Sequence, residues 1–529
     1  MKWEVYGSEA LLSAIDSRAQ VDGIIGLPPH RMSRAPIWRV AVSITGLTAV
    51  ASAIWIAPVA TAVALALAGF GLPALALVWA RPEIGLIALL ALSSGLVAPD
   101  IVDVRLPFGG LDLRDLLLGG MIGLLFLRRR FVGNAESTWR VLGGPLLLFI
   151  SLAVYSALYA ILYGNVERNA ALAELRPLVY YSTFFIAVWA LTRRAQIVLL
   201  MAMMFIVADV TAAVIIVQQF LGQGTFLLGV MAQGSWLIWQ QGDWGAAFGS
   251  VRVIPPDHVL VYVMAIVAFA LMLFPRFGLL LRGAFGLQFL FLNVGLLLTY
   301  TRSQWLASAV ALSALCLLLP RPDKVALVRV LALAMMLSLV LVLGGASVLT
   351  RWESSPTVRM LGERASSILT PQETLETDSL VWRSFETEEA LRSISQHPLL
   401  GVGLGNAYRN VTTLGYEADR VQSRFTQFVH DSYLYIAVKM GIPGLLAFVW
   451  CCLAFLIATW KSYWEMGDGL SRRLVMVMFA SFLGVLLWSA FMSTLMQVES
   501  AVALGLTTGL SFRLRHIELL SARSHSIRL

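Results

Sequence analysis

The sequence predicts an all-α polytopic membrane protein, with about fourteen transmembrane helices and one large extracytoplasmic loop. Of its 529 residues, 58% are hydrophobic and only 13% are charged, whereas a soluble domain carries about 25% charged residues. The mean hydropathy is +0.79. Apolar runs of about 18 residues or more, long enough to span a bilayer, recur along the chain. The predicted spans are 38–56, 57–80, 84–99, 113–128, 142–163, 177–192, 196–222, 256–275, 279–300, 302–320, 326–349, 441–461, 472–494 and 499–513.

The distribution of basic residues predicts how these spans are oriented. Lys and Arg gather in alternate short loops, and cytoplasmic loops carry such an excess in membrane proteins. With the basic loops placed inside, the spans alternate consistently and both termini are cytoplasmic. The basic loops contain Arg81, Arg128 to Arg130, Arg193, Arg194, Arg276, Arg321, Lys324, Arg472 and Arg473.

This orientation places the longest polar segment outside the cytoplasm. Five segments follow from it along the chain. They are a cytoplasmic leader over 1–37, a transmembrane helical region over 38–349, a large extracytoplasmic loop over 350–429, C-terminal transmembrane helices over 430–513 and a basic cytoplasmic tail over 514–529.

Within the large loop, the stretch "DSLVWRSFETEEALRSISQ" predicts an amphipathic helix. Leu380, Phe385, Leu391 and Ile394 are the apolar residues available for its buried face. The stretch "HPLLGVGLGN" follows directly and ends this helix, because proline and three glycines interrupt regular structure.

Two common classes of binding site receive no support from the sequence. The formal net charge of +8 does not indicate a nucleic-acid partner, because the basic residues are scattered between apolar spans and form no stripe. Cys316, Cys451 and Cys452 fall inside predicted spans, form no disulfide framework and show no metal-ligand spacing. We therefore expect neither nucleic-acid binding nor a metal site.

Four ionisable residues, Arg176, Arg252, Arg302 and His430, map to the outer ends of predicted spans. An ionisable group at mid-bilayer costs about 2.5–3.5 kcal/mol, and less near the ends, so it usually lines a cavity or pairs with another group. Arg302 is the sharpest case, because it lies between two strongly apolar spans with no neutralising neighbour in sequence. Guanidinium groups bind phosphate bidentately, and a neutral imidazole can accept a proton. Together these groups suit a substrate with a diphosphate leaving group and a hydroxyl nucleophile.

Several of these positions also have a structural explanation. Arg176 can pair with Glu174 or reach the lipid headgroups, and Arg252 can be an ordinary loop residue. His430 can be a satisfied structural histidine, and Asp431 can simply cap the helix that follows.

Three stretches resemble the O-antigen ligase and Wzy-type polymerase superfamily. "SQHPLLGVGLGNAY" and "FVHDSYLYIAVKMGIPGLLAF" are similar to its C-terminal signature, and "LLLTYTRSQWLASAVAL" is similar to the preceding span. The resemblance extends over residues 140–510. It implies a GT-C-like glycosyltransferase of the bacterial inner membrane, with an active site that faces the periplasm or the exterior.

The resemblance implies an inverting, metal-independent transfer that uses no cofactor. The donor is a glycan on undecaprenyl diphosphate in the outer leaflet, and the acceptor is a sugar hydroxyl on a glycan or a lipid core. The product is the O-antigen of lipopolysaccharide, or an exopolysaccharide, for the cell envelope. Beyond the lipid bilayer, the implied partners are a flippase and a chain-length regulator.

The resemblance also assigns roles to residues. His430 in the loop-end motif is the candidate general base, and Arg302 in the span motif is the candidate clamp on the diphosphate. Arg383 resembles a family arginine that precedes the glycine-rich stretch. Arg176 and Arg252 match less specific arginine positions, and we expect all three to contact the diphosphate or the glycan.

Asp431 departs from the family pattern, which often has asparagine at this position. A carboxylate next to His430 would favour the charged imidazole. We therefore expect Asp431 either to orient His430 near the substrate or to cap the helix.

Other functions stay open. A lipid-linked oligosaccharide flippase is also polytopic and arginine-lined, but it needs access from both faces and charge at mid-membrane depth. A sensor or structural role is a further alternative. Within the leading class, ligase and polymerase differ only in acceptor, and the number of predicted spans favours the polymerase. A metal-dependent glycosyltransferase would instead use carboxylates, for which the candidates are Asp100, Asp103, Asp112 and Asp115.

Overall fold

The computed structural model describes residues 72–97, 112–132, 140–221, 227, 237–239, 252–320, 323–325, 327–329, 378–409, 426–467 and 469–526. Nearly all of them belong to one compact unit, Ala74–Leu529, and the other unit is Met1–Pro73. Some of the predicted segments lie outside the described residues. They are the leader over 1–37, the span 38–56, most of the span 57–80 and nearly all of the span 326–349.

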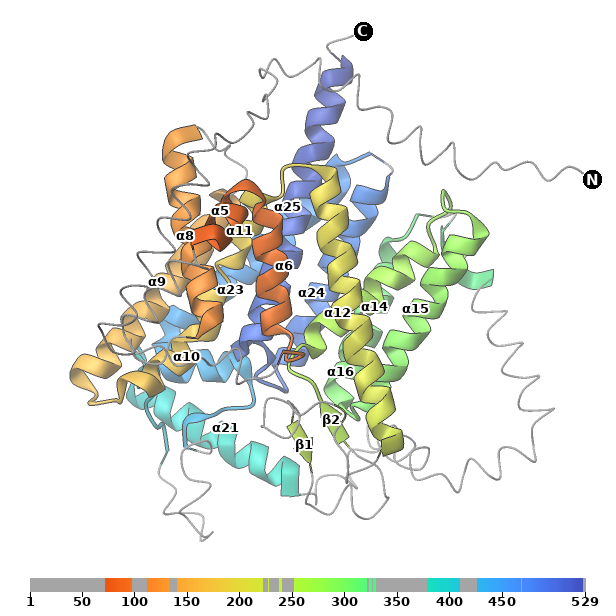
Figure 1. The fold of residues 1–529 in the computed structure, drawn as a ribbon. Coiled ribbons are helices and arrows are strands. Elements are labelled where there is room, and N and C mark those ends of the chain that lie inside the picture. The colour runs from red at the N-terminus through yellow and green to blue at the C-terminus, as the bar shows by residue number, and fades with distance from the viewer. Residues whose placement is uncertain are drawn as a thin grey trace, which may run out of the picture. The chain divides into compact units, whose positions relative to one another are not determined.

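Most described residues form α-helices, and one short pair of antiparallel strands accompanies them (Figure 1). The helices are α5 (Leu72–Ala80), α6 (Pro82–Ser93), α8 (Leu113–Val132), α9 (Arg140–Tyr163), α10 (Arg168–Tyr180), α11 (Thr183–Ala190), α12 (Arg194–Leu221), α14 (His258–Met272), α15 (Leu279–Leu298), α16 (Arg302–Leu318), α21 (Asp378–Gln396), α23 (Ser432–Glu465), α24 (Leu470–Ser489), the 3-10 turn η4 (Thr494–Met496) and α25 (Val498–Ser526). The strands are β1 (Leu237–Trp239) and β2 (Arg252–Ile254).

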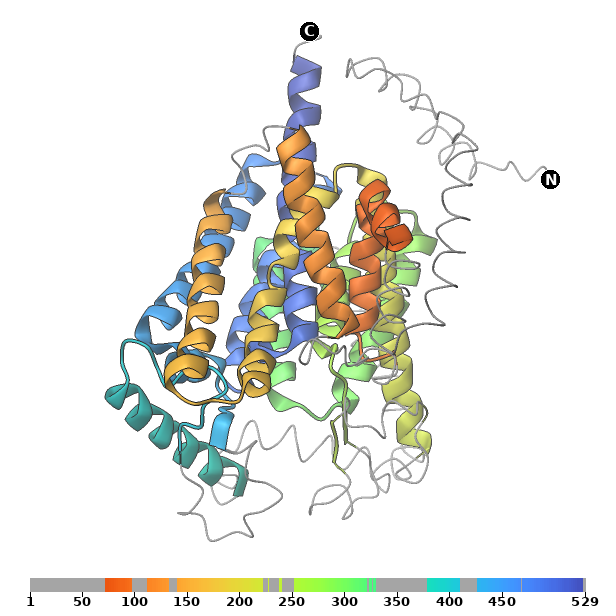
Figure 2. The same ribbon diagram turned by 60° about the vertical axis from the view of Figure 1, so that its left-hand side comes forward.

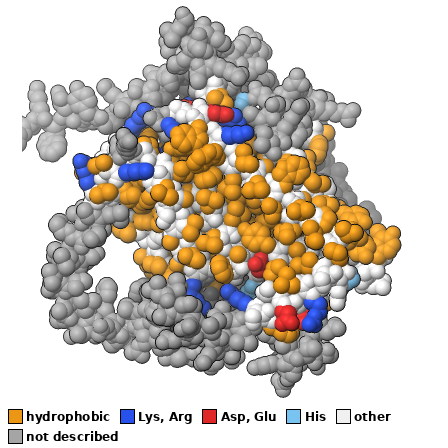
Figure 3. All heavy atoms as spheres, turned by 180° about the vertical axis from the view of Figure 1, so that it is seen from behind, with side chains coloured by type: hydrophobic (Ala, Val, Ile, Leu, Met, Phe, Trp, Pro, Cys, Tyr) orange, Lys and Arg blue, Asp and Glu red, His pale blue; other side chains and the backbone are white. Residues whose placement is uncertain are grey.

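Length and composition make this a polytopic helical membrane protein, as predicted. Within the described residues, 6 helical segments are long and apolar enough to cross a bilayer, and the shorter apolar helices α6, α14 and α16 accompany them. Figure 3 shows hydrophobic side chains over the middle of one face. The total of about fourteen spans stays a prediction. The six segments are Leu142–Tyr163, Arg168–Ala190, Arg194–Gln219, Leu279–Leu298, Ser432–Glu465 and Leu470–Ser489.

One predicted boundary is wrong in an informative way. The sequence predicts a span over 177–192, but the helical segment already begins at Arg168, and a short break separates α10 from α11. The part that the prediction left out contains Glu174 and Arg176. Both side chains find oppositely charged partners on other helices, so the helix can carry them.

Most successive helices run in opposite directions, so the basic turns lie at one end of the helices and α21 lies at the other. We call the end that contains α21 the α21 end. The starts of α16 and α23 and the strands β1 and β2 lie there too. In Figures 1 and 2 this end lies opposite the C-terminal end of α25. Helix direction then places the start of α12 and the α14–α15 and α23–α24 turns at the other end, the basic end, with Arg194, Arg276 and Arg472.

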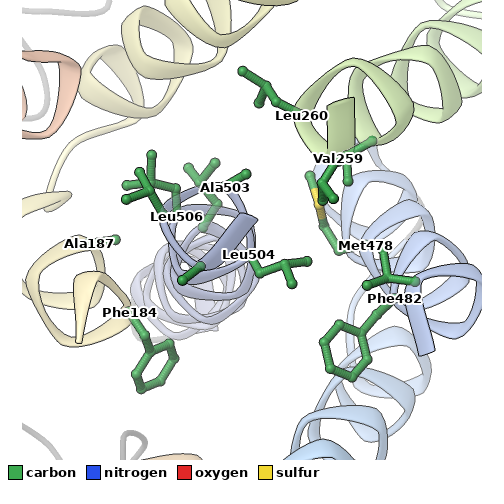
Figure 4. Packing of buried hydrophobic residues seen from close by; sticks show 14 of the residues in the cluster. Phe184, Ala187, Val259, Leu260, Met478, Phe482, Ala503, Leu504 and Leu506 are labelled. Atoms are coloured by element: carbon green, nitrogen blue, oxygen red, sulfur yellow. The ribbon is translucent and has the colours of Figure 1, made fainter. Parts of the chain in front are cut away.

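Helix α25 lies at the centre of the packing. It contacts α10, α11, α14 and α24, and Figure 4 shows Ala503, Leu504 and Leu506 of α25 between Phe184 of α11 and Phe482 of α24. The sequence predicts that this span ends at residue 513 and that a tail follows. The helix extends beyond this predicted span and continues to Ser526.

Helix α21 covers the residues expected for an amphipathic helix, but its buried face differs from the expected one. Leu391 is 54% exposed, whereas Glu386, Ala390 and Ser393 are buried. These three share one face because they are separated by four and three residues. The buried face of the helix therefore includes the polar residue Glu386.

Helix α23 is interrupted where the glycine-rich stretch packs against it. Gly441 has a φ of +70°, which favours glycine, and a Cβ there would lie 2.5 Å from the carbonyl oxygen of Leu399. The interruption leaves the amide of Ile442 free to donate to Pro398 O at 2.8 Å. In return, the amide of Val402 donates to Val438 O at 2.8 Å. The glycine-rich stretch is thus pinned to the first part of α23.

Candidate active site

The carboxylate of Glu386 organises the polar groups at the α21 end. Its Oε2 accepts a hydrogen bond from the backbone amide of His430 at 3.1 Å and lies 2.8 Å from the ring Nδ1 of His430. The Glu386 side chain is 4% exposed, whereas that of His430 is 34% exposed. The acid of this pair is therefore sealed inside the protein, while the imidazole is open on one side.

Arg409 closes the other side of Glu386. Its guanidinium lies 3.7 Å from Glu386 Oε1, and its side chain is 2% exposed. The guanidinium also lies over the rings of Tyr408 and Phe385, at 5.3 and 5.9 Å from their centroids. These contacts hold a counter-charge behind the carboxylate.

A small separate core fixes α21 against the chain around His430. It consists of Ala390, Tyr408, Val429, Tyr435 and Val438, and so joins α21 to the first part of α23. The hydroxyl of Tyr408 donates to Phe428 O at 3.3 Å. The ring of Phe428 meets the His430 imidazole edge to face at 5.0 Å between centroids.

Arg383 and Arg302 lie close enough for their positive charges to interact. Arg383 precedes Glu386 by one helical turn on α21, and Arg302 begins α16. Burial lowers the pKa of Arg383 below its ordinary value, and the charge of Arg302 lowers it further, while Glu386 opposes the shift. A multivalent anion between the two guanidiniums would be stabilised by both.

Asp431 caps α23. One carboxylate oxygen accepts from the amides of Tyr433 and Leu434 at 2.7 and 3.0 Å. Burial raises the pKa of Asp431 above its ordinary value, these two hydrogen bonds lower it, and Glu386 raises it. Glu386, and not Asp431, contacts the imidazole of His430. Of the two roles expected for Asp431, the geometry favours the cap.

Arg176 lies in a different network, between α8 and α10. Its guanidinium is 2.9 Å from Asp115 and 3.6 Å from Asp112. Arg114 also pairs with Asp112, at 2.7 Å, and Tyr180 donates to Asp115 at 2.9 Å. Two of the four carboxylates that we considered for a metal-dependent reaction, Asp112 and Asp115, are thus engaged with arginines. The other two, Asp100 and Asp103, lie outside the described residues.

The partner expected for Arg176, Glu174, has a separate role. It pairs with Lys439 at 2.8 Å and accepts from the amide of Gly405 at 2.6 Å. Lys439 also donates to Asn406 O at 2.6 Å. Gly405 has a φ of +81°, and a Cβ there would lie 2.6 Å from Ala171 N, so only glycine fits.

Two further sequence predictions can be placed more briefly. Arg252 begins β2, where it lies opposite Trp239 of β1. Within the part of the chain that the structure describes, no group of three or more His, Cys, Asp or Glu residues could hold a metal ion.

Sequence reasoning missed Glu386 and Arg409. Glu386 is one of three glutamates in "FETEEAL", and the search for an apolar face passed over it. Its spacing to Ala390 and Ser393 was the available signal, because residues three and four apart lie on the same face of a helix. Arg409 gave no comparable signal, since its partner lies on another element.

Comparison with known protein families gives one match. Residues 286–449 match the family model described as O-antigen ligase, and this confirms the resemblance found in the sequence. The matched segment contains Arg302, Arg383, Glu386, Arg409 and His430. No curated protein matches the chain.

Proposed function

We propose that this chain, which matches the O-antigen ligase family over residues 286–449, transfers a glycan from a polyprenyl diphosphate to an acceptor sugar hydroxyl. The observation that carries the proposal is the gathering of His430, Arg302 and Arg383 at the α21 end. An open imidazole supplies a base, and two neighbouring guanidiniums supply a site for a diphosphate. All three lie within the matched segment.

The proposed reaction is a direct displacement at the anomeric carbon of the donor. The acceptor hydroxyl oxygen forms the new glycosidic bond, and the bond between the anomeric carbon and the diphosphate oxygen breaks, so the configuration inverts. The hydroxyl proton moves to Nε2 of His430. The electron pair of the broken bond stays on the lipid diphosphate, whose growing charge Arg302 and Arg383 stabilise.

The proposed active site lies on the side of a bacterial inner membrane that faces away from the cytoplasm. Arg276 lies in the α14–α15 turn at the basic end, Arg194 begins α12, and Arg472 lies in the first turn of α24. Such residues gather at the cytoplasmic ends of membrane spans. In the proposed orientation, the α21 end is extracytoplasmic and the end of α25 is cytoplasmic. The donor is accordingly a lipid-linked glycan of the outer leaflet, undecaprenyl diphosphate being the carrier that the family resemblance implies.

The experiment that tests this function uses the purified full chain in lipid with a short polyprenyl diphosphate oligosaccharide. Glycan products are analysed by mass spectrometry, with and without a chelator. We expect transfer that survives chelation. His430→Ala should lower the rate by about 10²–10⁴-fold, the usual contribution of a general base. His397→Ala is the matched control, because His397 is an exposed histidine of the large loop that precedes His430.

Each result of this experiment has a definite meaning. A ladder of repeat units indicates a polymerase, whereas transfer that requires an added lipid-core or glycan acceptor indicates a ligase. Full activity of His430→Ala contradicts the proposed base. Transfer that stops on chelation contradicts the metal-independent mechanism. Movement of intact donor across the vesicle membrane, without any transfer product, would favour a flippase.

A further inference from the structure

We propose that Glu386 is the positioning residue of His430, and that Arg409 keeps its carboxylate in place. Glu386 fixes which imidazole nitrogen carries the proton and supplies the negative charge that stabilises the imidazolium. This inference rests on the proposed function, because it deepens the role of His430 as general base. It concerns two residues, Glu386 and Arg409, that the sequence motifs did not indicate.

The first step concerns the tautomer of His430. An ionised carboxylate has only acceptors, so the ring nitrogen 2.8 Å from Glu386 Oε2 must carry a hydrogen. That nitrogen is Nδ1, and the neutral imidazole therefore has its lone pair on Nε2. Nε2 is the nitrogen turned away from Glu386, and it can take the acceptor proton.

The second step concerns the rigidity of the arrangement. The same oxygen of Glu386 accepts from the His430 backbone amide at 3.1 Å, so backbone and ring are held by one atom. Phe428 meets the ring edge to face and limits its rotation. Arg409 lies 3.7 Å from the second carboxylate oxygen, in a position where water has little access. A base held in this way keeps one orientation between turnovers.

The third step concerns charge. When His430 takes a proton, the imidazolium lies directly against the Glu386 carboxylate, and the low exposure of that carboxylate strengthens the attraction. Asp431 provides no equivalent contact, because its carboxylate accepts from the amides of Tyr433 and Leu434. Glu386 is therefore the acid that assists proton transfer.

A purely structural role for Glu386 makes a different prediction. In that case Glu386 only ties α21 to the chain at His430, and a neutral acceptor of the same shape would replace it. Glu386→Gln distinguishes the two roles, because the amide oxygen still accepts from both N–H groups while the charge is lost. Glu388→Gln is the matched control, since Glu388 is on the same helix and its side chain is 73% exposed.

The experiment measures both transfer and the state of the ring. The transfer rate is recorded against pH, and ¹⁵N-histidine spectra of the full chain in detergent report the tautomer and titration of His430, assigned with His430→Ala. For Glu386→Gln we expect a loss of about 10–100-fold in rate and a move of the acid limb to lower pH by about one unit, because the imidazolium loses its counter-charge. The ring titration should move in the same direction. Glu386→Asp should recover part of the rate.

The two readouts separate this inference from the proposed function. If Glu386→Gln titrates and transfers like the unchanged protein, the inference is wrong and Glu386 is structural. If the ring titration moves but the unchanged protein transfers no glycan, the pairing of Glu386 with His430 stands and the proposed function fails. Arg409→Met should lower the transfer rate less than Glu386→Gln does, because the carboxylate keeps its charge and loses only the cation that holds it in place.

Discussion

Two acid–base pairs at the α21 end differ in which partner is open. Lys439 and Glu174 are 2.8 Å apart, with side chains 0% and 15% exposed, and His430 and Glu386 are also 2.8 Å apart, with side chains 34% and 4% exposed. In the first pair the cation is sealed, and the neighbouring polar atoms belong to the protein's own backbone. In the second pair the acid is sealed and the base faces outward. The first geometry suits a structural lock, and the second suits chemistry on a bound molecule.

The lock also explains how the second pair is held. Glu174 on α10 and Lys439 on α23 both bind the glycine-rich stretch, at Gly405 and Asn406. That stretch leads directly into Tyr408 and Arg409, which contact Glu386 and the chain around His430. Loss of the lock should therefore disturb the active pair, whereas loss of the active pair should leave the lock intact.

The largest effect on stability is expected when the Lys439–Glu174 pair is broken. Lys439→Met leaves the Glu174 carboxylate without its cation, and breaking such a buried pair costs about 3–5 kcal/mol of unfolding free energy. The measurement is the unfolding transition in detergent. Lys461→Met, at an exposed position of the same helix, is the control and should unfold like the unchanged protein.

A double variant sharpens the same comparison. In Glu174→Gln with Lys439→Met the charge is absent from both sides, and the glutamine oxygen can still accept from Gly405 N. We expect the double variant to regain a large part of the lost stability. If Lys439→Met alone unfolds normally, the pair is not a lock and the contrast with Glu386 and His430 disappears.

A smaller effect is expected for Arg302 and Arg383, and it concerns the transfer reaction. Arg302→Ala and Arg383→Ala should each lower kcat/KM by about 10–100-fold, because a hydrogen bond to a charged group contributes about 1.5–3 kcal/mol. Inhibition by inorganic pyrophosphate should weaken in parallel, and the unfolding transition should change little. Arg392→Ala is the control, because Arg392 is on the exposed face of α21. Normal pyrophosphate inhibition in both variants would exclude these arginines from the diphosphate site.

The smallest effect is expected at Asp431. Asparagine caps a helix about as well as aspartate, so Asp431→Asn should change the unfolding free energy at neutral pH by less than about 0.5 kcal/mol. The pKa of Asp431 is raised in the folded protein, so its contribution favours folding at low pH and is lost as pH rises through that pKa. The variant should therefore gain stability relative to the unchanged protein between acid and neutral pH. Loss of transfer activity would instead make Asp431, like Glu386, a partner of His430.

Sequence reasoning worked best where the evidence was local. Apolar runs predicted the helices Arg140–Tyr163 and Leu279–Leu298 closely, and the loop helix begins and ends at the expected residues, 378 and 396. The motif around His430 led to the family that the comparison confirms. Length, hydropathy and motif spacing are properties of neighbouring residues, so they can be read without the fold.

Sequence reasoning failed where a charge is neutralised by a distant residue. Arg176 pairs with Asp112 and Asp115, not with its neighbour Glu174. The helical segment that contains Arg176 begins at Arg168, and not at the predicted residue 177.

The sequence by itself determined that this is a multi-pass helical membrane protein and that the stretches around His430 and Arg302 resemble the O-antigen ligase family. Only the tertiary structure decided which acid serves His430. The carboxylate of Asp431, the sequence neighbour of His430, accepts from the amides that begin α23. The packing of α21 brings the carboxylate of Glu386 within 2.8 Å of the His430 ring. Hydrogen-bond partners depend on distances in space, and the folded helices fix those distances.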